Sequence, residues 1–331
     1  MQSIRRILFA IRNPESARQP GLAKAIQVAR AFDARLELFH AINDPLFVEF
    51  ALQEEHTADK LRERAEEEVR IPLARMCAKA RKHGLQAECS VEWDYPPHEA
   101  IVRRAAAIGA DLIIAEGHKG GRTRPWLIHL TDWELLRTSP LPVLLIKNGK
   151  AYHRPLTLAA VDPARAHAKP RQLDTRIVES ARQLSDALHG SLHMMHANYP
   201  SIVGLPNARS SEDWKWTTLS YDQLKEQERE AFEAFRAEMH VMRTRAHLAI
   251  GNPATVIPAL ARELGARIVV MGALSRSGLS RVFIGNTAER VLESLPCDVL
   301  VVKPEGVAPR VSQEIKGMRI VAPTTLTPMA F

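Results

Sequence analysis

Short runs of apolar residues alternate along the chain with longer stretches in which apolar residues recur every three or four positions. The short runs predict buried strands, and the longer stretches predict helices that pack on them. The predicted strands are residues 7–11, 36–41, 88–93, 111–115 and 142–147, and then 156–161, 191–197, 245–250, 267–271 and 298–303. An ordered alternation of this kind predicts an α/β fold with parallel sheets.

The two halves of the chain repeat each other. GADLIIAE at 109–116 lies over GARIVVMG at 265–272, and LPVLLIK at 141–147 lies over CDVLVVK at 297–303. Both comparisons give the same offset of 156 residues (265 − 109 and 297 − 141) without a gap, which indicates an internal duplication. We therefore predict an N-terminal domain over residues 1–150, a C-terminal domain over 151–305 and a flexible tail over 306–331.

Each half has five predicted strands, so the chain is expected to form two tandem, doubly wound, five-stranded parallel-sheet domains. In such sheets a ligand binds at the carboxyl ends of the strands, where the winding reverses. In the second half, three segments reach this edge: Asp162 after the first strand, His196–Ala197 at the end of the second, and the loop after Met271. We call this edge of each half its crevice.

Composition narrows the class of protein. Hydrophobic residues make up 46% and charged residues 25% of the 331 positions, which is typical of a soluble globular chain. The net charge of +7 is spread over the chain, so a nucleic-acid partner is not expected. The start, MQSIRRILFAIR, is interpreted as a first strand rather than a signal peptide, and no apolar run is long enough for a membrane helix. The expected location is the cytoplasm, and the three cysteines are interpreted as reduced core thiols.

The stretch GALSRSGLSRVFIGNTAERV at 272–291 has the composition of a phosphate loop. Gly272 would allow close approach of the backbone to a ligand, and Gly278 would allow a positive φ. Gly285, Asn286 and Thr287 precede a helical pattern, and the free N–H groups of a helix start attract anions. Arg276 adds positive charge, while Asp162 could accept hydrogen bonds from ribose hydroxyls or an adenine amino group.

Other constellations favour neither a metal site nor an enzyme. His193 and His196 are three residues apart on a predicted strand, so their side chains point to opposite faces and are unsuited to share one metal ion. The sequence contains no G-K-[ST] motif of an ordinary P-loop ATPase, and Ser275 lacks the leading glycine of a nucleophile elbow. Trp214 and Trp216 are interpreted as packing against the neighbouring domain.

The pattern Gly272-x-x-Ser275-x9-Gly285-Asn-Thr resembles the nucleotide loop of the universal stress protein family, and the chain is most similar to its tandem, E-type members. The resemblance implies two domains of the adenine-nucleotide α-hydrolase-like fold, paired through their last strands as an intramolecular pseudo-dimer. It also implies a stress-response role, with ATP, ADP or a related ligand bound by some members. The binding positions carried over are Ala160, Val161, Asp162, Ala197, Gly272, Ser275, Gly285, Asn286 and Thr287.

The chain departs from this family pattern in both halves. In the second half, Ser275 replaces a glycine, and Asn286 replaces a hydroxyl residue, with Thr287 one position later. In the first half, the equivalents of Gly272, Gly278 and Gly285-Asn286 are Glu116, Arg122 and His129-Leu130, and Arg12 takes the place of Asp162. Because a carboxylate repels phosphate, we expect no ATP in the first domain.

The predicted function is that of a ligand-binding regulatory module, with a nucleotide or similar phosphate-bearing ligand in the C-terminal domain. One alternative is a weak ATPase or self-phosphorylating enzyme that uses Asp162 with the Ser275 and Thr287 hydroxyls. Another is a scaffold that binds an amphipathic ligand, a protein or RNA without ATP. A protein partner and a further homodimer also stay open.

Overall fold

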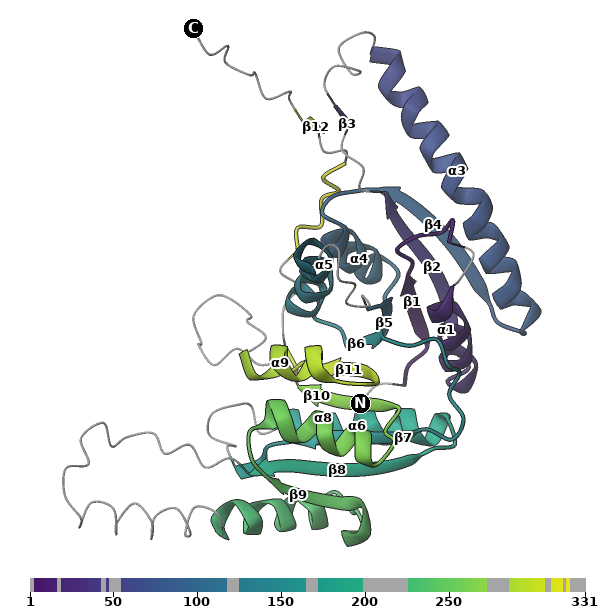
Figure 1. The fold of residues 1–331 in the computed structure, drawn as a ribbon. Helices are drawn as coiled ribbons and strands as arrows, with labels where there is room; N and C mark the ends of the chain where they lie inside the picture. The colour runs from purple at the N-terminus through teal and green to yellow at the C-terminus, as the bar shows by residue number, and fades with distance from the viewer. Residues whose placement is uncertain are drawn as a thin grey trace, which may run out of the picture. The chain divides into compact units, whose positions relative to one another are not determined.

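The structure is a computed structural model that describes residues 3–16, 19–42, 46–47, 55–117, 125–164, 172–198, 226–272, 286–306, 311–317 and 320–321 (Figure 1). The chain divides into two compact units. The first unit is Ser3–Pro140 with Pro309–Phe331, and the second is Leu141–Ala308 with Met1–Gln2. Each unit is described by itself below.

The first unit is a parallel sheet with the strand order β4-β2-β1-β5. Its strands are β1 (Arg6–Ala10), β2 (Arg35–Ile42), β4 (Ala87–Trp93) and β5 (Leu112–Glu116). The helices between them are α1 (Pro20–Ala31), α3 (Glu55–Lys82), α4 (Pro97–Ala107) and α5 (Pro125–Thr138). Leu8 and Phe9 of β1 have no exposed surface, as expected for a central strand covered on both faces.

The second unit repeats this arrangement in the strand order β6-β11-β10-β7-β8-β9. Its strands are β6 (Val143–Ile146), β7 (Leu156–Val161), β8 (Ser191–Asn198), β9 (Ala246–Ile250), β10 (Ile268–Gly272) and β11 (Asp298–Val302). Its helical elements are α6 (Gln172–Ala187), η2 (Arg243–Arg245), α8 (Pro253–Glu263), α9 (Asn286–Ser294) and a helix over 226–238. The five strands β7 to β11 are parallel, which confirms the predicted doubly wound sheet.

Strand β6 is the last strand of the first repeat, but it packs in the second unit. It pairs antiparallel with β11, the last strand of the second repeat, with Leu144 opposite Leu300. This pairing of two last strands is the one that an intramolecular pseudo-dimer requires.

Asp298 fixes the segment that joins the two repeats. The buried Asp298 carboxylate accepts hydrogen bonds from the backbone N–H of Lys147 at 2.8 Å and from the Tyr152 hydroxyl at 2.6 Å. Burial, with the neighbouring Asp298 carboxylate, raises the pKa of Tyr152 well above its usual value, so this hydroxyl keeps its proton. The joining segment is thus part of the second unit's core.

Part of the C-terminal segment packs on the first unit. The Arg103 guanidinium donates to the Ser312 carbonyl at 3.3 Å, and the Lys316 backbone N–H donates to Asp94 Oδ1 at 2.9 Å. The Lys316 ammonium also lies 2.6 Å from Glu99 Oε2. Beyond it, β12 (Ile320–Val321) pairs in parallel with the short β3 (Leu46–Phe47). Residues 311–317 are therefore held by charged groups at the start of α4.

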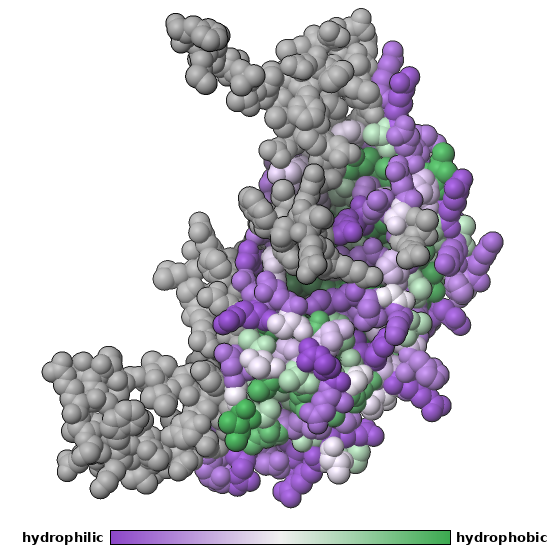
Figure 2. Space-filling model, in the orientation of Figure 1, coloured by the Kyte–Doolittle hydropathy of each residue, from purple (hydrophilic) through white to green (hydrophobic). Residues whose placement is uncertain are grey.

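The described surface is mostly hydrophilic in the view of Figure 2, with hydrophobic residues in small separate areas. Among the larger apolar side chains with a described environment, Ile250 at the end of β9 is the most exposed, at 65%. Within the described ranges, we find no helix with the length and apolarity that a membrane crossing requires.

Candidate functional site: two equivalent crevices

Strand pairing aligns the crevices of the two halves. Ala10 pairs with Ala115 in the first unit, and Ala160 pairs with Met271 in the second. Because residues 115 and 271 are equivalent at the offset of 156, Ala10 and Ala160 are equivalent as well. Two residues further along, Arg12 of the first half therefore occupies the position of Asp162 in the second.

The second crevice places Asp162 directly after β7. Its backbone N–H donates to Asp174 Oδ1 of α6 at 3.0 Å, which fixes the end of the strand. Its carboxylate is 39% exposed and can accept hydrogen bonds from a ligand. Ala160 and Val161 form the end of the same strand, and Ala197 lies near the end of the neighbouring β8. These four residues meet at one edge of the sheet, as the sequence predicts.

His196 lies beneath this edge and is only 2% exposed. Its Nδ1 lies 3.1 Å from the Val161 carbonyl oxygen, and because a carbonyl only accepts, Nδ1 must carry the hydrogen. The ring stacks on Phe232 with the centroids 5.9 Å apart, and Nε2 lies 3.8 Å from Glu228 Oε2. Sequence reasoning placed His196 in the crevice lining, whereas the structure buries it as a support for the strand end.

Gly272 ends β10 and has a packing role of its own. A Cβ at this position would lie 2.7 Å from Leu173 Cδ2 and 3.1 Å from Ile177 Cδ1, both on α6. The absence of a side chain therefore lets α6 approach the sheet, whatever Gly272 does for a ligand. The sequence offered only the ligand explanation for this glycine.

The remaining predicted loop residues are largely outside the described part of the chain. Ser275, Arg276, Gly278 and Gly285 lie outside it, as do Arg122, Trp214 and Trp216. Helix α9 begins at Asn286, so Asn286 and Thr287 occupy its first positions, but their side chains and those of His129 and Leu130 are not described. Their roles in binding phosphate stay predictions.

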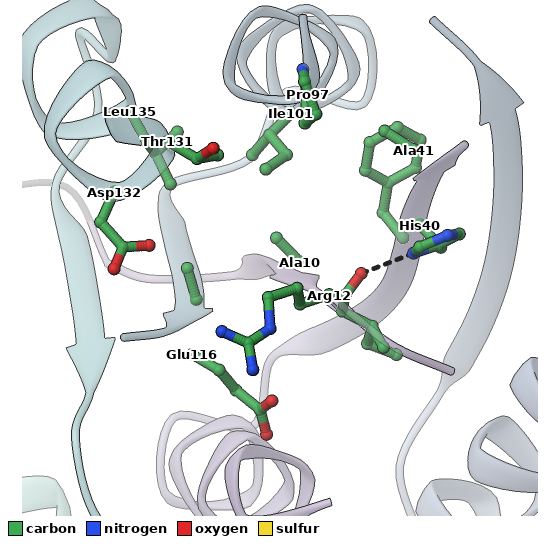
Figure 3. Close-up of a pocket in the computed structure, with 13 residues that line it drawn as sticks. Ala10, Arg12, His40, Ala41, Pro97, Ile101, Glu116, Thr131, Asp132 and Leu135 are labelled. Carbon is green, nitrogen blue, oxygen red and sulfur yellow. Dashed lines mark hydrogen bonds between the residues drawn. The ribbon is translucent and has the colours of Figure 1, made fainter. Parts of the chain in front are cut away.

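The first crevice contains a cavity of about 210 Å³ (Figure 3). Its polar lining comes from Arg12, His40, Glu116, Thr131 and Asp132. Its apolar lining includes Phe39, Pro97, Ile101 and Leu135. Figure 3 shows Arg12, Glu116 and Asp132 around one side of the cavity and the apolar side chains of α4 and α5 across from them. The cavity thus has a charged end and an apolar end.

Glu116 of this cavity is tied to the start of α1. Its Oε1 accepts a hydrogen bond from the Gly21 backbone N–H at 2.7 Å. A Cβ on Gly21 would lie 2.6 Å from Glu116 Cγ, so the glycine is needed for this approach. The carboxylate satisfies one of the unpaired N–H groups of the helix start and is favoured by its positive dipole end. The acidic residue that replaces Gly272 therefore has a structural partner in the first half.

His40 is the counterpart of His196, and sequence reasoning missed it. Leu36 pairs with Ile7, and Leu192 pairs with Thr157, so β2 and β8 also align at the offset of 156. His40 Nδ1 lies 2.7 Å from the Ile11 carbonyl oxygen, the same contact that His196 makes with Val161. The repeat offset alone would have found this residue.

His193 contacts His247, not His196. His193 Nδ1 lies 2.9 Å from His247 Nε2, and the rings stack at 5.3 Å with an interplanar angle of 7°. At the equivalent place in the first half, the Ser90 hydroxyl donates to Glu37 at 2.6 Å. No group of three or more His, Cys, Asp or Glu side chains suited to a metal ion occurs among the residues described.

Comparisons with known proteins agree with the duplication. The model of the Universal stress protein family matches residues 3–147 and 158–303. Universal stress protein E of Escherichia coli strain K12 is 27% identical over 299 residues, covering 90% of this chain and 94% of that protein. Universal stress protein E of Photorhabdus laumondii is 27% identical over 301 residues, covering 90% of this chain and 95% of that protein.

Solved structures are similar over the same length. A putative universal stress protein from Pseudomonas aeruginosa UCBPP-PA14 has a TM-score of 0.70 and 27% identity, covering 91% of this chain and 94% of that one. A protein of unknown function from Pseudomonas aeruginosa PAO1 has a TM-score of 0.69 and 27% identity, covering 91% of this chain and 93% of that one.

Proposed function

The chain belongs to the universal stress protein family, with two such domains in tandem, and we propose that its second domain binds a nucleotide or a similar phosphate-bearing ligand. Asp162 would accept hydrogen bonds from the sugar or base, beside the backbone of Ala160, Val161 and Ala197. The phosphate would lie against the loop that contains Gly272, Ser275, Arg276, Gly278, Gly285, Asn286 and Thr287. The output is ligand-dependent interaction with other molecules in the stress response, and not turnover.

A charge difference between the two crevices carries this proposal. At the end of the first strand, the second half has the acceptor Asp162 where the first half has Arg12. At the end of the fourth strand, the second half has Gly272 where the first half has Glu116. A phosphate would face a carboxylate in the first crevice, whereas in the second it would face a backbone without a side chain. Nucleotide binding is therefore proposed for one crevice only.

The geometry around Asp162 supports binding over catalysis. Asp174 fixes the Asp162 backbone, so the carboxylate projects from an ordered strand end. His196 is the obvious general base by residue type, but its ring is 2% exposed and its Nδ1–H is donated to a carbonyl. It is therefore not placed to accept a proton from a water molecule beside a bound phosphate.

A matched pair of variants tests the proposal. ATP, ADP and AMP affinities are measured by calorimetry for the wild type, Asp162→Ala and Arg12→Ala, and mass spectrometry identifies ligands released from the purified protein. Because hydrogen bonds to a charged group contribute about 1.5–3 kcal/mol, Asp162→Ala should weaken binding at least about tenfold. Arg12→Ala, at the equivalent position, should leave the affinity unchanged.

Three outcomes count against the proposal. No released nucleotide together with no binding of added nucleotide rejects it, and equal losses in the two variants place the ligand elsewhere. Hydrolysis of labelled ATP that disappears in Asp162→Ala would favour the alternative of a slow ATPase.

A further inference from the structure

The cavity of the first crevice is not explained by nucleotide binding in the second. The position where a phosphate would lie is next to Glu116, whose carboxylate is held by the Gly21 N–H. A cavity of about 210 Å³ nevertheless remains open in front of it. This is below the roughly 300–1,000 Å³ of pockets for drug-sized ligands, so the cavity has room only for a smaller molecule.

The charged end of this cavity carries both signs. Arg12 follows β1, Glu116 ends β5 and Asp132 lies on α5, so three separate elements bring these groups together (Figure 3). In the described part of the chain, Arg12 has no ion-pair partner, and it is exposed. A guanidinium in this state is suited to bind a carboxylate in a two-point geometry.

The two carboxylates require a different group on the ligand. Glu116 is fixed by its bond to Gly21, so it cannot turn away when a ligand enters. A ligand with only negative charge would face Glu116 and Asp132, and a ligand with only positive charge would face Arg12. A ligand that carries one charge of each sign satisfies both sides of the charged end.

The apolar end defines the rest of the ligand. Ile101 of α4, Leu135 of α5 and Phe39 of β2 line the side of the cavity away from the charges. Leu135 and Phe39 are almost fully buried, so this wall belongs to the core and is preformed. An apolar body placed against it would leave water without disturbing the fold.

We propose that the first crevice binds a small zwitterion with an apolar body, of which an apolar α-amino acid is the simplest example. Arg12 binds the carboxylate of the ligand, and Asp132 and Glu116 bind its ammonium group. This site is separate from the proposed nucleotide site. The nucleotide site would bind a negatively charged phosphate, whereas this site would bind a ligand with one charge of each sign. The two halves would then sense two chemically different small molecules.

Three probes with the same ring test this assignment on the full chain by calorimetry. L-phenylalanine carries both charges, 2-phenylethylamine lacks the carboxylate, and 3-phenylpropionate lacks the ammonium group. Because each charged hydrogen-bonded contact is lost in one analogue, phenylalanine should bind at least about tenfold more tightly than either.

Variants assign each charge to its residue. Arg12→Gln should weaken phenylalanine about tenfold and leave phenylethylamine nearly unchanged, whereas Asp132→Asn should weaken both amines and leave phenylpropionate nearly unchanged. Asp132 is used because Glu116 also supports α1. Asp162→Asn, in the other crevice, is the control and should change none of the three affinities. A thermal melt of each variant checks that it is folded.

Each contrary result overturns the proposal. Tightest binding of phenylpropionate would make this crevice an anion site. Tightest binding of phenylethylamine would make it a site for cations, and no binding of any probe at millimolar concentration would exclude the zwitterion. None of these results depends on Asp162, so they are distinguishable from a failure of the nucleotide proposal.

Discussion

The two crevices share one backbone and differ in charge. In both, a histidine on the second strand of the repeat contacts a backbone carbonyl where the first strand ends. His40 contacts the Ile11 carbonyl in the first half, and His196 contacts the Val161 carbonyl in the second. At the ligand positions the residues differ in charge: Arg12 occupies the position equivalent to Asp162, and Glu116 occupies the position equivalent to Gly272. The duplication has kept the support of the strand ends while the groups that would touch a ligand have diverged.

The same contrast extends to the start of the third described helix of each repeat, α4 in the first half and α8 in the second. In the first half, the buried Asp94 binds Arg103, with two nitrogen–oxygen distances of 2.7 and 2.6 Å. The equivalent positions, aligned through the ends of β4 and β9 and the starts of α4 and α8, are Gly251 and Ala259. The first half thus has a buried ion pair, with residues 311–317 packed over it, that the second half cannot form.

Removing this ion pair should have the largest effect on stability. Asp94→Ala leaves the Arg103 charge buried without its partner, and we expect a loss of about 3–5 kcal/mol in the free energy of unfolding. Urea unfolding followed by circular dichroism measures the loss, and limited proteolysis reports release of residues 311–317. The double variant Asp94→Ala/Arg103→Met, which removes both charges, should recover part of the loss. A single variant within about 1 kcal/mol of the wild type would contradict the assignment.

His196 should contribute more than His40 to the free energy of unfolding, because His196 is buried and His40 is half-buried. His196→Ala removes a buried ring from Phe232 and the side-chain N–H that contacts the Val161 carbonyl, which we expect to cost about 2–4 kcal/mol. His40→Ala removes the same contact at a half-buried site, where water can replace it, and should cost about 1 kcal/mol. Both values come from the midpoint of chemical unfolding. Equal losses would show that the shared hydrogen bond, and not burial, sets the effect.

Gly272→Ala tests whether packing alone requires the glycine. The added methyl group would press on Leu173, and overpacking of this kind costs about 1–3 kcal/mol. In the cycle with Leu173→Val, the loss should shrink because the two sites are in contact. Additive losses would mean that Leu173 is not what excludes a side chain. Nucleotide affinity of the same variant shows whether the glycine also serves the ligand.

The repeat offset predicted most of the fold from the sequence. Buried parallel strands are continuous apolar runs, so their positions and their equivalence between halves can be read without a structure. The correspondence of Arg12 with Asp162 followed from the same runs, and strand pairing agrees with it. Residues of the phosphate loop between 273 and 285 lie outside the described chain, so their roles stay predictions.

The remaining features depend on contacts between distant residues. Lys316 and Asp94 are 222 positions apart, and neither flanking sequence indicates that they meet. Glu116 looked like a lost glycine because its partner, the Gly21 N–H, lies 95 residues earlier. The packing reason for Gly272 likewise needs the position of α6, which no local pattern supplies. Sequence patterns predict which face of a strand or helix is buried. They do not predict which distant residue packs against that face.

The smallest expected effect is on how the stability of the fold depends on pH. It concerns His193 and His247 of the second half, whose equivalents in the first half are not histidines. Burial first, and the neighbouring His247 and Arg245 charges next, lower the pKa of His193, and burial likewise lowers the pKa of His247 although Glu263 opposes it. The first half has Glu37 and Ser90 at these positions. A base with a lowered pKa in the folded state takes up its proton first in the unfolded state, so stability is present above the ordinary value of 6.5 and falls as the pH drops below it.

The double variant His193→Gln/His247→Gln should therefore lose less stability than the wild type between about pH 7.5 and pH 5.5. Both rings are partly exposed, so the difference should be below about 1 kcal/mol. Burial also lowers the pKa of His98 in the first half. His98→Gln is therefore the comparison variant from the first half, and it should reduce the loss of stability in acid independently of the histidine pair. Urea unfolding at the two pH values measures both. If the double variant has the same pH dependence as the wild type, the histidine pair is not an acid-sensitive element of the second half.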